Sequence, residues 1–244
     1  MVNMPRSQVA GTLLLTLVAG WATLPVTADE ASLPDVQLEY VFARFNTAAP
    51  PPYRAYRHLE AGDRGRGKHA TMDVWTEHRP GAGLRFEVIR EQGSEYVRNK
   101  VLRGVLKAEQ ELIDAGKPLR APLVPRNYDF EHGGTTPEGL QRLLLHPARK
   151  SDGVVRGSAL IAAGAGTIVR MEGRLTKSPS FWVRDVDVVW KFRRIGDAIL
   201  PTELSSSARV LFYGRSTFRM TYDYESVDGQ PLTGAVRAAS PHSE

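Results

Sequence analysis

The 244-residue sequence contains no cysteine. This absence excludes a catalytic cysteine, an iron–sulfur cluster held by cysteines and a cysteine-ligated zinc site. It also excludes disulfides, although a chain of this length buries enough apolar surface to fold without them. A bacterial lipoprotein needs a cysteine as its acylation point, so we expect a protein without a lipid anchor.

The sequence also lacks a long apolar run outside its first 28 residues. There, Arg6 precedes an apolar stretch over residues 11–26, and Val26-Thr27-Ala28 follows the pattern of a cleavage site. This order is typical of a secretory signal. The stretch is shorter than the roughly 20 residues of a membrane-spanning helix. We therefore predict a cleavable signal peptide over residues 1–28 and a soluble periplasmic product, with an uncleaved N-terminal anchor as the alternative.

The sequence has only a small excess of positive charge. Lys and Arg total 32 and Asp and Glu total 27, a formal net charge of +5. Short basic runs at residues 64–68 and 193–194 are interpreted as solvated turns. Because the protein is expected to be exported, we predict no nucleic-acid partner, while a basic protein remains compatible with transient membrane contact.

Sequence motifs of catalysis are scarce. The six histidines show no H-E-x-x-H or similar metal spacing, and no serine lies in a G-x-S-x-G elbow. Gly164-Ala165-Gly166 lacks the third glycine and the helix of a dinucleotide-binding turn. Asp185 and Asp187 alternate with apolar residues, which favours a solvated strand face over an acid–base pair. We expect no catalytic residue, metal or cofactor; a dispersed Ser-His-Asp site remains open because its members need not be close in sequence.

Alternation of apolar and polar residues dominates the rest of the chain. Residues 183–194 and 216–226 are the clearest cases, and such regularity predicts antiparallel strands with one buried face. Two segments depart from it. Residues 94–115 have helical spacing, with Ser94 as N-cap and Gly116 after the last turn. Residues 35–47 fit a helix or a strand, and we favour the helix.

Three further local predictions follow from the same pattern. Gly133-Gly134 predicts a turn. Residues 154–162 and 167–175 predict two further strands. Residues 84–88 predict a strand with one apolar face, and Ile89 is the exception to it.

These segments predict a mainly β (α+β) fold. About three strands separate the two helices, and six or seven strands follow the second. A single sheet of this length is expected to twist and curl, with the two helices covering its concave side. We predict one domain over residues 29–229. Residues 230–244 are small and polar without a period and are predicted to form a disordered tail.

The apolar face of this sheet is the candidate functional feature. It is either a filled core or the lining of a hydrophobic cavity for acyl chains, and the sequence leaves both interpretations open. The predicted lining residues are Val74, Phe86, Val88, Val188, Trp190, Phe192, Phe212, Phe218, Met220 and Tyr222.

Several segments carry a resemblance to a known group. They are Glu87-Val88-Ile89-Arg90-Glu91, Asn127-Tyr128-Asp129-Phe130, Ile168-Val169-Arg170-Met171-Glu172-Gly173, Ser178-Pro179-Ser180-Phe181-Trp182-Val183, Ile199-Leu200-Pro201, Phe212-Tyr213-Gly214-Arg215-Ser216 and Tyr222-Asp223-Tyr224. With them, residues 84–227 resemble a group of bacterial exported proteins that is similar to the outer-membrane lipoprotein-sorting (LolA/LolB-like) superfamily. The resemblance implies an open half-barrel with helices as a lid over a hydrophobic cavity. It implies no catalytic residue, and no individual functional residue is transferred.

Three hypotheses follow from the sequence. The leading one is a soluble periplasmic carrier that holds the acyl chains of a lipid or acylated lipoprotein, involved in envelope lipid or lipoprotein transport. The second is a non-catalytic envelope module with a filled core that binds a protein partner. The third is a hydrolase whose site is dispersed along the chain.

Overall fold

The computed structural model describes residues 35–46, 50–63, 67–178, 183–211 and 214–232. The predicted signal peptide, the lining residue Phe212 and residues 233–244 of the predicted tail lie outside these ranges. Among the described residues, no helix is long and apolar enough to cross a membrane.

Both predicted helices are present. The first is α1, Asp35–Phe45, which confirms the helix over the strand alternative. The second runs without a break through α2 (Glu95–Val97), the π-helical segment η1 (Arg98–Leu102) and α3 (Arg103–Asp114). Ser94 precedes this helix, but its side chain makes no capping hydrogen bond. Gly116 ends it with a φ of +64°, a conformation that glycine adopts without strain.

Eleven strands form one antiparallel sheet in the described part of the chain. Their bounds are β1 Tyr53–Asp63, β2 His69–Arg79, β3 Gly83–Gly93, β4 Tyr128–Thr135, β5 Gln141–Pro147, β6 Val155–Ala162, β7 Thr167–Leu175, β8 Val183–Ile195, β9 Ala198–Val210, β10 Gly214–Val227 and β11 Gln230–Pro231. A short 3-10 turn, η2 (Ala163–Ala165), lies between β6 and β7.

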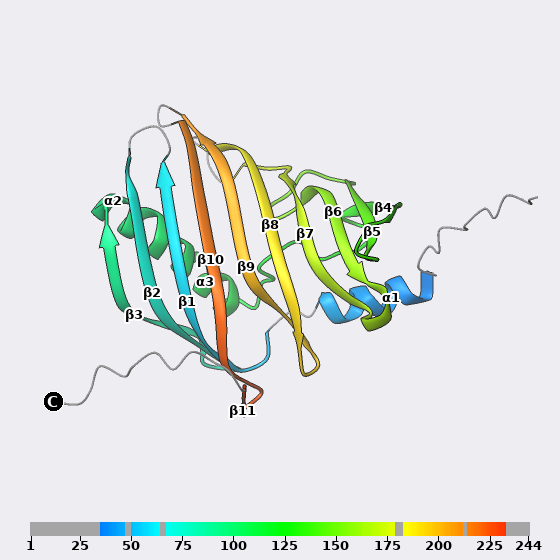
Figure 1. Ribbon diagram of the computed structural model, residues 1–244, viewed down its shortest axis with the longest axis horizontal. Coiled ribbons are helices and arrows are strands. Elements are labelled where there is room, and N and C mark those ends of the chain that lie inside the picture. Colours follow the sequence, from blue (N-terminus) through cyan, green and yellow to red (C-terminus); the bar gives the residue numbers. More distant parts are fainter. Residues whose placement is uncertain (1–34, 47–49, 64–66, 179–182, 212–213, 233–244) are drawn as a thin grey trace, which may run out of the picture. The chain divides into compact units, whose positions relative to one another are not determined.

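The strand order is β3-β2-β1-β10-β9-β8-β7-β6-β5-β4, with β11 added to β10. Two runs of neighbouring hairpins, β1–β3 and β4–β10, therefore share one sheet through the pairing of β1 with β10. The edge strands β3 and β4 do not pair with each other, so the curled sheet stays open (Figure 1). This confirms the predicted open half-barrel.

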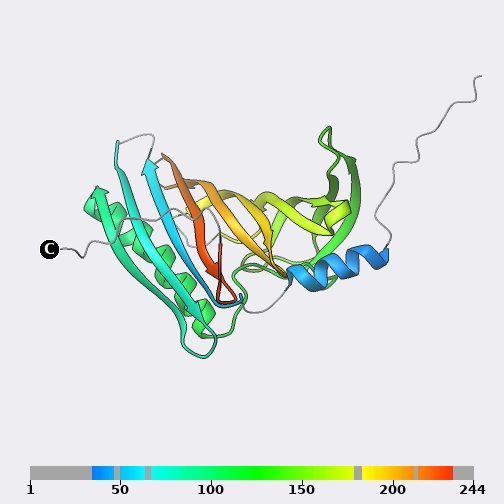
Figure 2. The same ribbon diagram turned by 60° about the horizontal axis from the view of Figure 1, so that its bottom comes forward.

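The helices cover the two ends of one sheet face. The long helix packs on β1, β2 and β3, whereas α1 packs on β7 and β9. Figure 2 shows α3 and α1 on the same, concave side of the sheet, separated along it. The two helices thus lie on the concave side as predicted, but each covers a different group of strands.

Each covered end has its own apolar core. One cluster joins Val41 and Phe45 of α1 to β4–β9. A second joins Leu102 and Leu106 of the long helix to β1, β2 and β10. A third, smaller cluster lies around Tyr53 and Tyr224 at one end of β1 and β10. The alternation predicted from the sequence is what brings these side chains to one face.

The structure corrects two local predictions and explains one local exception. The turn expected at Gly133-Gly134 is wrong, because both glycines lie within β4, where the register with β5 is irregular. Ile89, which breaks the alternation of β3, is the extra residue of a β-bulge opposite Asp73 and Val74. The ordered sheet also passes the domain end expected at residue 229, since Gln230 pairs with Val227.

Candidate functional site

The middle of the concave face carries half-buried apolar side chains between the two helices. We call Trp190, Leu204, Phe218 and Tyr222 the concave strip. They come from β8, β9 and β10, and the register places Leu204 directly opposite both Trp190 and Met220. Leu204, Phe218 and Tyr222 pack against the cluster under the long helix, and Trp190 packs against the α1 cluster. The strip therefore connects the two cores across the uncovered strands.

The structure places the predicted lining residues in two groups on one face. Val74, Phe86, Val88, Phe218, Met220 and Tyr222 belong to the cluster under the long helix. Val188, Trp190 and Phe192 belong to the α1 cluster. Val74 and Met220 are 0% and 1% exposed, so they touch a ligand only if the helix moves away. The half-buried members are accessible without such a movement, and the lining of a cavity by the whole set stays a prediction.

A buried ion pair attaches the long helix to the sheet. Both oxygens of the Glu109 carboxylate accept hydrogen bonds from Arg57 on β1, at 2.6 and 3.0 Å. Arg57 also donates to the Tyr53 hydroxyl at 2.6 Å and lies 4.4 Å from the centre of the Tyr222 ring. Burial lowers the pKa of Arg57, but the Glu109 carboxylate outweighs it, and the pKa lies well above its usual value. Arg57 is therefore charged and compensated.

A second arginine near the α1 cluster has different surroundings. Arg120 lies in the proline-rich connection between α3 and β4 and donates a 2.7 Å hydrogen bond to the Phe45 carbonyl oxygen. Its guanidinium carbon lies 3.9 Å from the ring centre of Phe45 and 5.1 Å from that of Phe192. Burial lowers the pKa of Arg120 to about 10. No carboxylate of the described residues lies within ion-pair distance of it.

Arg120 lines a small cavity of about 70 Å³. Phe45 and Asn46 of the α1 end, Ile199 and Leu200 of β9, and Leu119 of the connection form its walls together with five prolines. These segments are far apart in sequence and meet where the connection passes the end of α1. A cavity of this size accommodates a small polar group and not an acyl chain.

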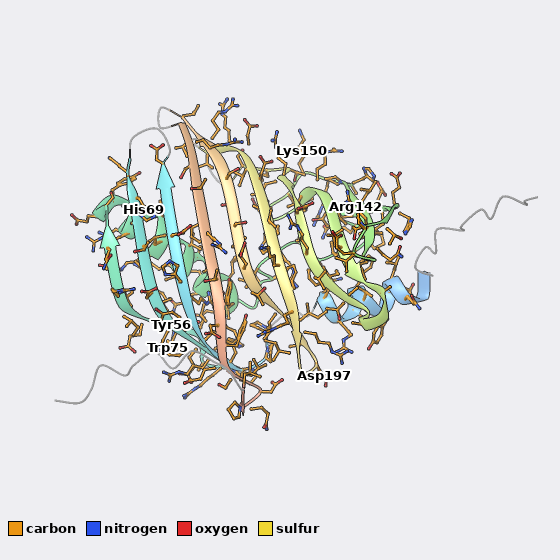
Figure 3. All side chains as sticks on the ribbon, viewed as in Figure 1. Tyr56, His69, Trp75, Arg142, Lys150 and Asp197 are labelled. Atoms are coloured by element: carbon orange, nitrogen blue, oxygen red, sulfur yellow. The ribbon has the colours of Figure 1, made fainter. Side chains whose placement is uncertain are left out.

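The opposite, convex face is polar and ion-paired. Asp73, with a side chain 6% exposed, accepts hydrogen bonds from His58 at 2.6 Å and from Arg90 at 3.1 Å. Glu203 pairs with both Lys191 and Arg219. Tyr56 and Trp75 lie together on this face near one end of β1 and β2, with rings in edge contact (Figure 3). Such a surface offers an acyl chain little apolar contact.

The two aspartates considered as an acid–base pair have separate partners. Asp187 binds Arg174 at 2.8 Å, and this hydrogen bond lowers the pKa of Asp187. Asp185 lies in a β-bulge with a φ of +49° and contacts Arg209 at 3.7 Å. Their geometry agrees with a solvated, ion-paired surface. Within the described ranges, no group of three or more histidines and acidic residues is placed to hold a metal ion.

Comparisons with known proteins give a distant likeness in structure. No family model matches the sequence, and no curated protein matches it. A DUF1329 family protein from Desulfovibrio piger aligns over 77% of this chain and 90% of its own, with 9% identity and a TM-score of 0.39. A LolA superfamily protein from Nitrosomonas europaea aligns over 75% and 90%, with 7% identity and a TM-score of 0.35.

Both matches have TM-scores under 0.5, so they record a distant likeness in structure and carry no argument about superfamily or role. At this identity no residue role transfers from either protein. The function proposed below therefore rests on the chemistry of the concave face.

Sequence reasoning missed the two buried or partly buried arginines. Arg57 interrupts the inward-facing row of β1, and Glu109 lies on the buried side of α3, so two charges at core positions were a usable signal. Arg120 gave no comparable signal, because a connection with several prolines has no period from which burial can be inferred.

Proposed function

We propose that this protein is exported to the periplasm, where it binds an acyl chain of a lipid or lipoprotein on the concave strip and carries it through the envelope. The observation that supports this most directly is the strip itself. Four large apolar side chains lie half-buried on a sheet face whose helices cover only its ends, whereas the convex face is polar.

The energetics of such a site are sufficient for a carrier. Each methylene that leaves water contributes about 0.8 kcal/mol, so burial of six methylenes gives about 5 kcal/mol before the entropic costs of binding. An adaptable aromatic and aliphatic surface accepts chains of different length, because apolar contact has no directional requirement. We propose binding and no catalytic step.

The test compares two neighbouring positions of β9 on opposite faces. Leu204→Gln places an amide in the concave strip, and Ser205→Gln makes a polar substitution on the convex face. Delipidated protein is titrated with a fluorescent fatty acid and a lipopeptide. We expect Leu204→Gln to weaken binding about tenfold, since two lost methylene contacts correspond to about 1.5 kcal/mol, and Ser205→Gln to bind like the wild type. Wild-type protein that takes up neither probe would overturn the proposal.

The envelope-module hypothesis has one observation in its favour. Val74 and Met220, two of the predicted lining residues, are fully covered by the long helix in this conformation. If the concave face is only a core, a pull-down from envelope extract yields a protein partner, and native mass spectrometry of the gently purified protein shows no lipid. Co-purified acyl chains would instead support the carrier.

A further inference from the structure

Arg120 is a charged group to which the described residues supply no counter-charge. Another arginine of the concave side, the buried Arg57, does have a counter-charge, because both oxygens of Glu109 accept its hydrogen bonds. Arg120 has one carbonyl oxygen and two aromatic rings as neighbours, and no acidic side chain of the described residues pairs with it. With a pKa of about 10, it remains protonated at neutral pH.

A guanidinium has five N–H donors, and the bond to Phe45 uses one of them. The remaining donors are suited to a planar or tetrahedral anion, which arginine binds through two parallel hydrogen bonds. Arg120 is half-buried against two aromatic rings, so water reaches only part of its charge, and an arriving anion supplies the missing partner. The group is therefore prepared for an anionic ligand.

The walls of the cavity add few competing polar groups. Five of its lining residues are prolines, which carry no backbone N–H donor: Pro50, Pro51, Pro118, Pro122 and Pro201. The oxygen and one N–H of the Asn46 amide are already used, because the amide accepts from and donates to the backbone of Leu123. Among the described lining residues, Arg120 alone carries a positive charge. An anion that enters this cavity has Arg120 as its partner.

The cavity also adjoins the apolar surface proposed to hold a chain. Phe192, which lies against the guanidinium, is two residues from Trp190 on β8, and both side chains pack in the α1 cluster. Phe192 itself is buried, but a ligand with a charged group at Arg120 can extend its hydrocarbon past it toward the half-buried Trp190 of the concave strip. This juxtaposition of one unpaired cation with an apolar surface is the chemistry that recognises an anionic amphiphile.

We propose that Arg120 binds the anionic head group, a carboxylate or a phosphate, of the amphiphile whose chain lies on the concave strip. The inference rests on the proposed function and adds the charge of the ligand to it. It makes Arg120 a binding residue that discriminates between ligands of equal chain length.

The experiment uses three probes with the same twelve-carbon chain: dodecanoate, dodecyl phosphate and dodecanol. Each is titrated into the delipidated full chain of wild type, Arg120→Gln and Arg126→Gln, the two anions below their micellar concentrations and dodecanol below its solubility limit. Arg126 is an exposed arginine of the same connection, so its variant removes an equal charge outside the cavity. Thermal melting of each variant verifies folding, and we expect Arg120→Gln to fold because it removes an uncompensated charge.

We expect wild type to bind an anionic probe at least tenfold more tightly than dodecanol, a difference of about 1.4 kcal/mol. Arg120→Gln removes this preference and leaves the affinity for dodecanol unchanged, whereas Arg126→Gln retains the preference. The tighter of the two anionic probes identifies a carboxylate or a phosphate as the head group.

Three results would overturn the inference, and they differ in what they imply. If wild type binds dodecanol as tightly as both anions, Arg120 has no head-group role while the chain-binding function stands; this comparison needs no variant. If Arg126→Gln loses the preference as fully as Arg120→Gln, the effect is general electrostatic attraction. If no probe binds, both the inference and the proposed function fail.

Discussion

At the scale of single residues, a pair of glycines determines how closely two strands approach. Gly157 on β6 and Gly173 on β7 lie directly opposite each other in the register. A Cβ atom added to Gly157 would overlap the Glu172 carbonyl oxygen, and one added to Gly173 would overlap the Arg156 carbonyl oxygen. Both obstacles are backbone atoms, which cannot rotate away.

Gly157→Ala is therefore expected to destabilise the protein by about 1–3 kcal/mol or more, the usual cost of forcing an additional carbon into a packed interior. Gly104→Ala is the matched control. Gly104 lies in α3 with no atom in the way of a Cβ, so alanine should stabilise the helix by about 1 kcal/mol. Urea unfolding measures the change in the free energy of unfolding for both variants. A Gly157→Ala protein as stable as the wild type would contradict the close approach of the two strands.

The sequence shows that these residues are glycines, but it does not show that they lie opposite each other on neighbouring strands. Gly157 and Gly173 each lie within a segment predicted as a strand. Their close approach depends on the register of β6 and β7, including the irregularity after Leu160, which single-residue patterns do not specify.

At the scale of elements, the Arg57–Glu109 pair determines how firmly the long helix is held. Its two side chains are 0% and 9% exposed, so removal of one partner leaves a buried charge. The helix ends in hydrogen bonds from Gly116 to Ile113 and from Lys117 to Leu112, a Schellman motif that does not depend on the pair. The ion pair acts on the packing of the helix and not on its formation.

Glu109→Ala is expected to reduce the free energy of unfolding by about 3–5 kcal/mol, because it leaves Arg57 uncompensated. Glu111→Ala, on the exposed side of the same helix, should change it by at most about 0.5 kcal/mol. The double variant Arg57→Met with Glu109→Met should recover most of the loss, since both charges are then absent. Urea unfolding measures these stabilities. If Glu109→Ala and Glu111→Ala were equally stable, the ion pair would not be what holds the helix.

The helix itself was predicted from its period, but its π-helical segment was not. Val97, Leu102 and Leu106 are all buried, and the spacing of five between the first two fits the wider π turn. The neighbouring Val101 satisfies the ordinary spacing of four equally well in the sequence. Two adjacent apolar residues therefore leave the local turn undecided, and packing against β1 and β2 decides it.

The predicted turn at Gly133-Gly134 failed for a related reason. An edge strand tolerates glycine, because it pairs on one side only. The chain instead reverses after β4 at residues 136–140, where the Thr136 amide donates to the Leu140 carbonyl oxygen and Gly139 adopts a φ of +78°. Gly133-Gly134 and Gly139 lie only a few residues apart, and local composition does not show which of them the chain uses for its turn.

At the scale of the whole sheet, the curled architecture followed from strand count and alternation, whereas the candidate site did not. The cavity at Arg120 joins Phe45, Leu119 and Ile199, which come from a helix, a connection and a strand far apart in sequence. Their meeting depends on how the α3–β4 connection crosses the concave side. No local pattern encodes that path.

Ligand binding at this scale should act on the entire domain. Because the concave strip contacts both large clusters, a bound amphiphile stabilises one cooperative unit. At a free concentration of 100 times its Kd, a ligand adds about 2.7 kcal/mol, which for a domain of this size raises Tm by roughly 5–10 °C. Differential scanning calorimetry with dodecanoate measures the shift. At the same dodecanoate concentration, Leu204→Gln should show a smaller rise in Tm. If the domain unfolded in two separate transitions and dodecanoate raised the Tm of only one, that result would contradict a site shared by both clusters.

The pairing of β1 with β10 has a consequence for how the chain reaches this structure. All other pairings of the sheet join strands that follow one another in sequence, so they form as soon as each hairpin is complete. β1 is made first in the sheet and keeps an unpaired edge until β10, near the other end of the chain, reaches it. Contacts of such separation slow folding, and an open strand edge invites association with other chains. A chain that stops before β10 therefore leaves two sets of hairpins with no shared sheet. The time during which the edge of β1 remains unpaired is set by the arrival of β10.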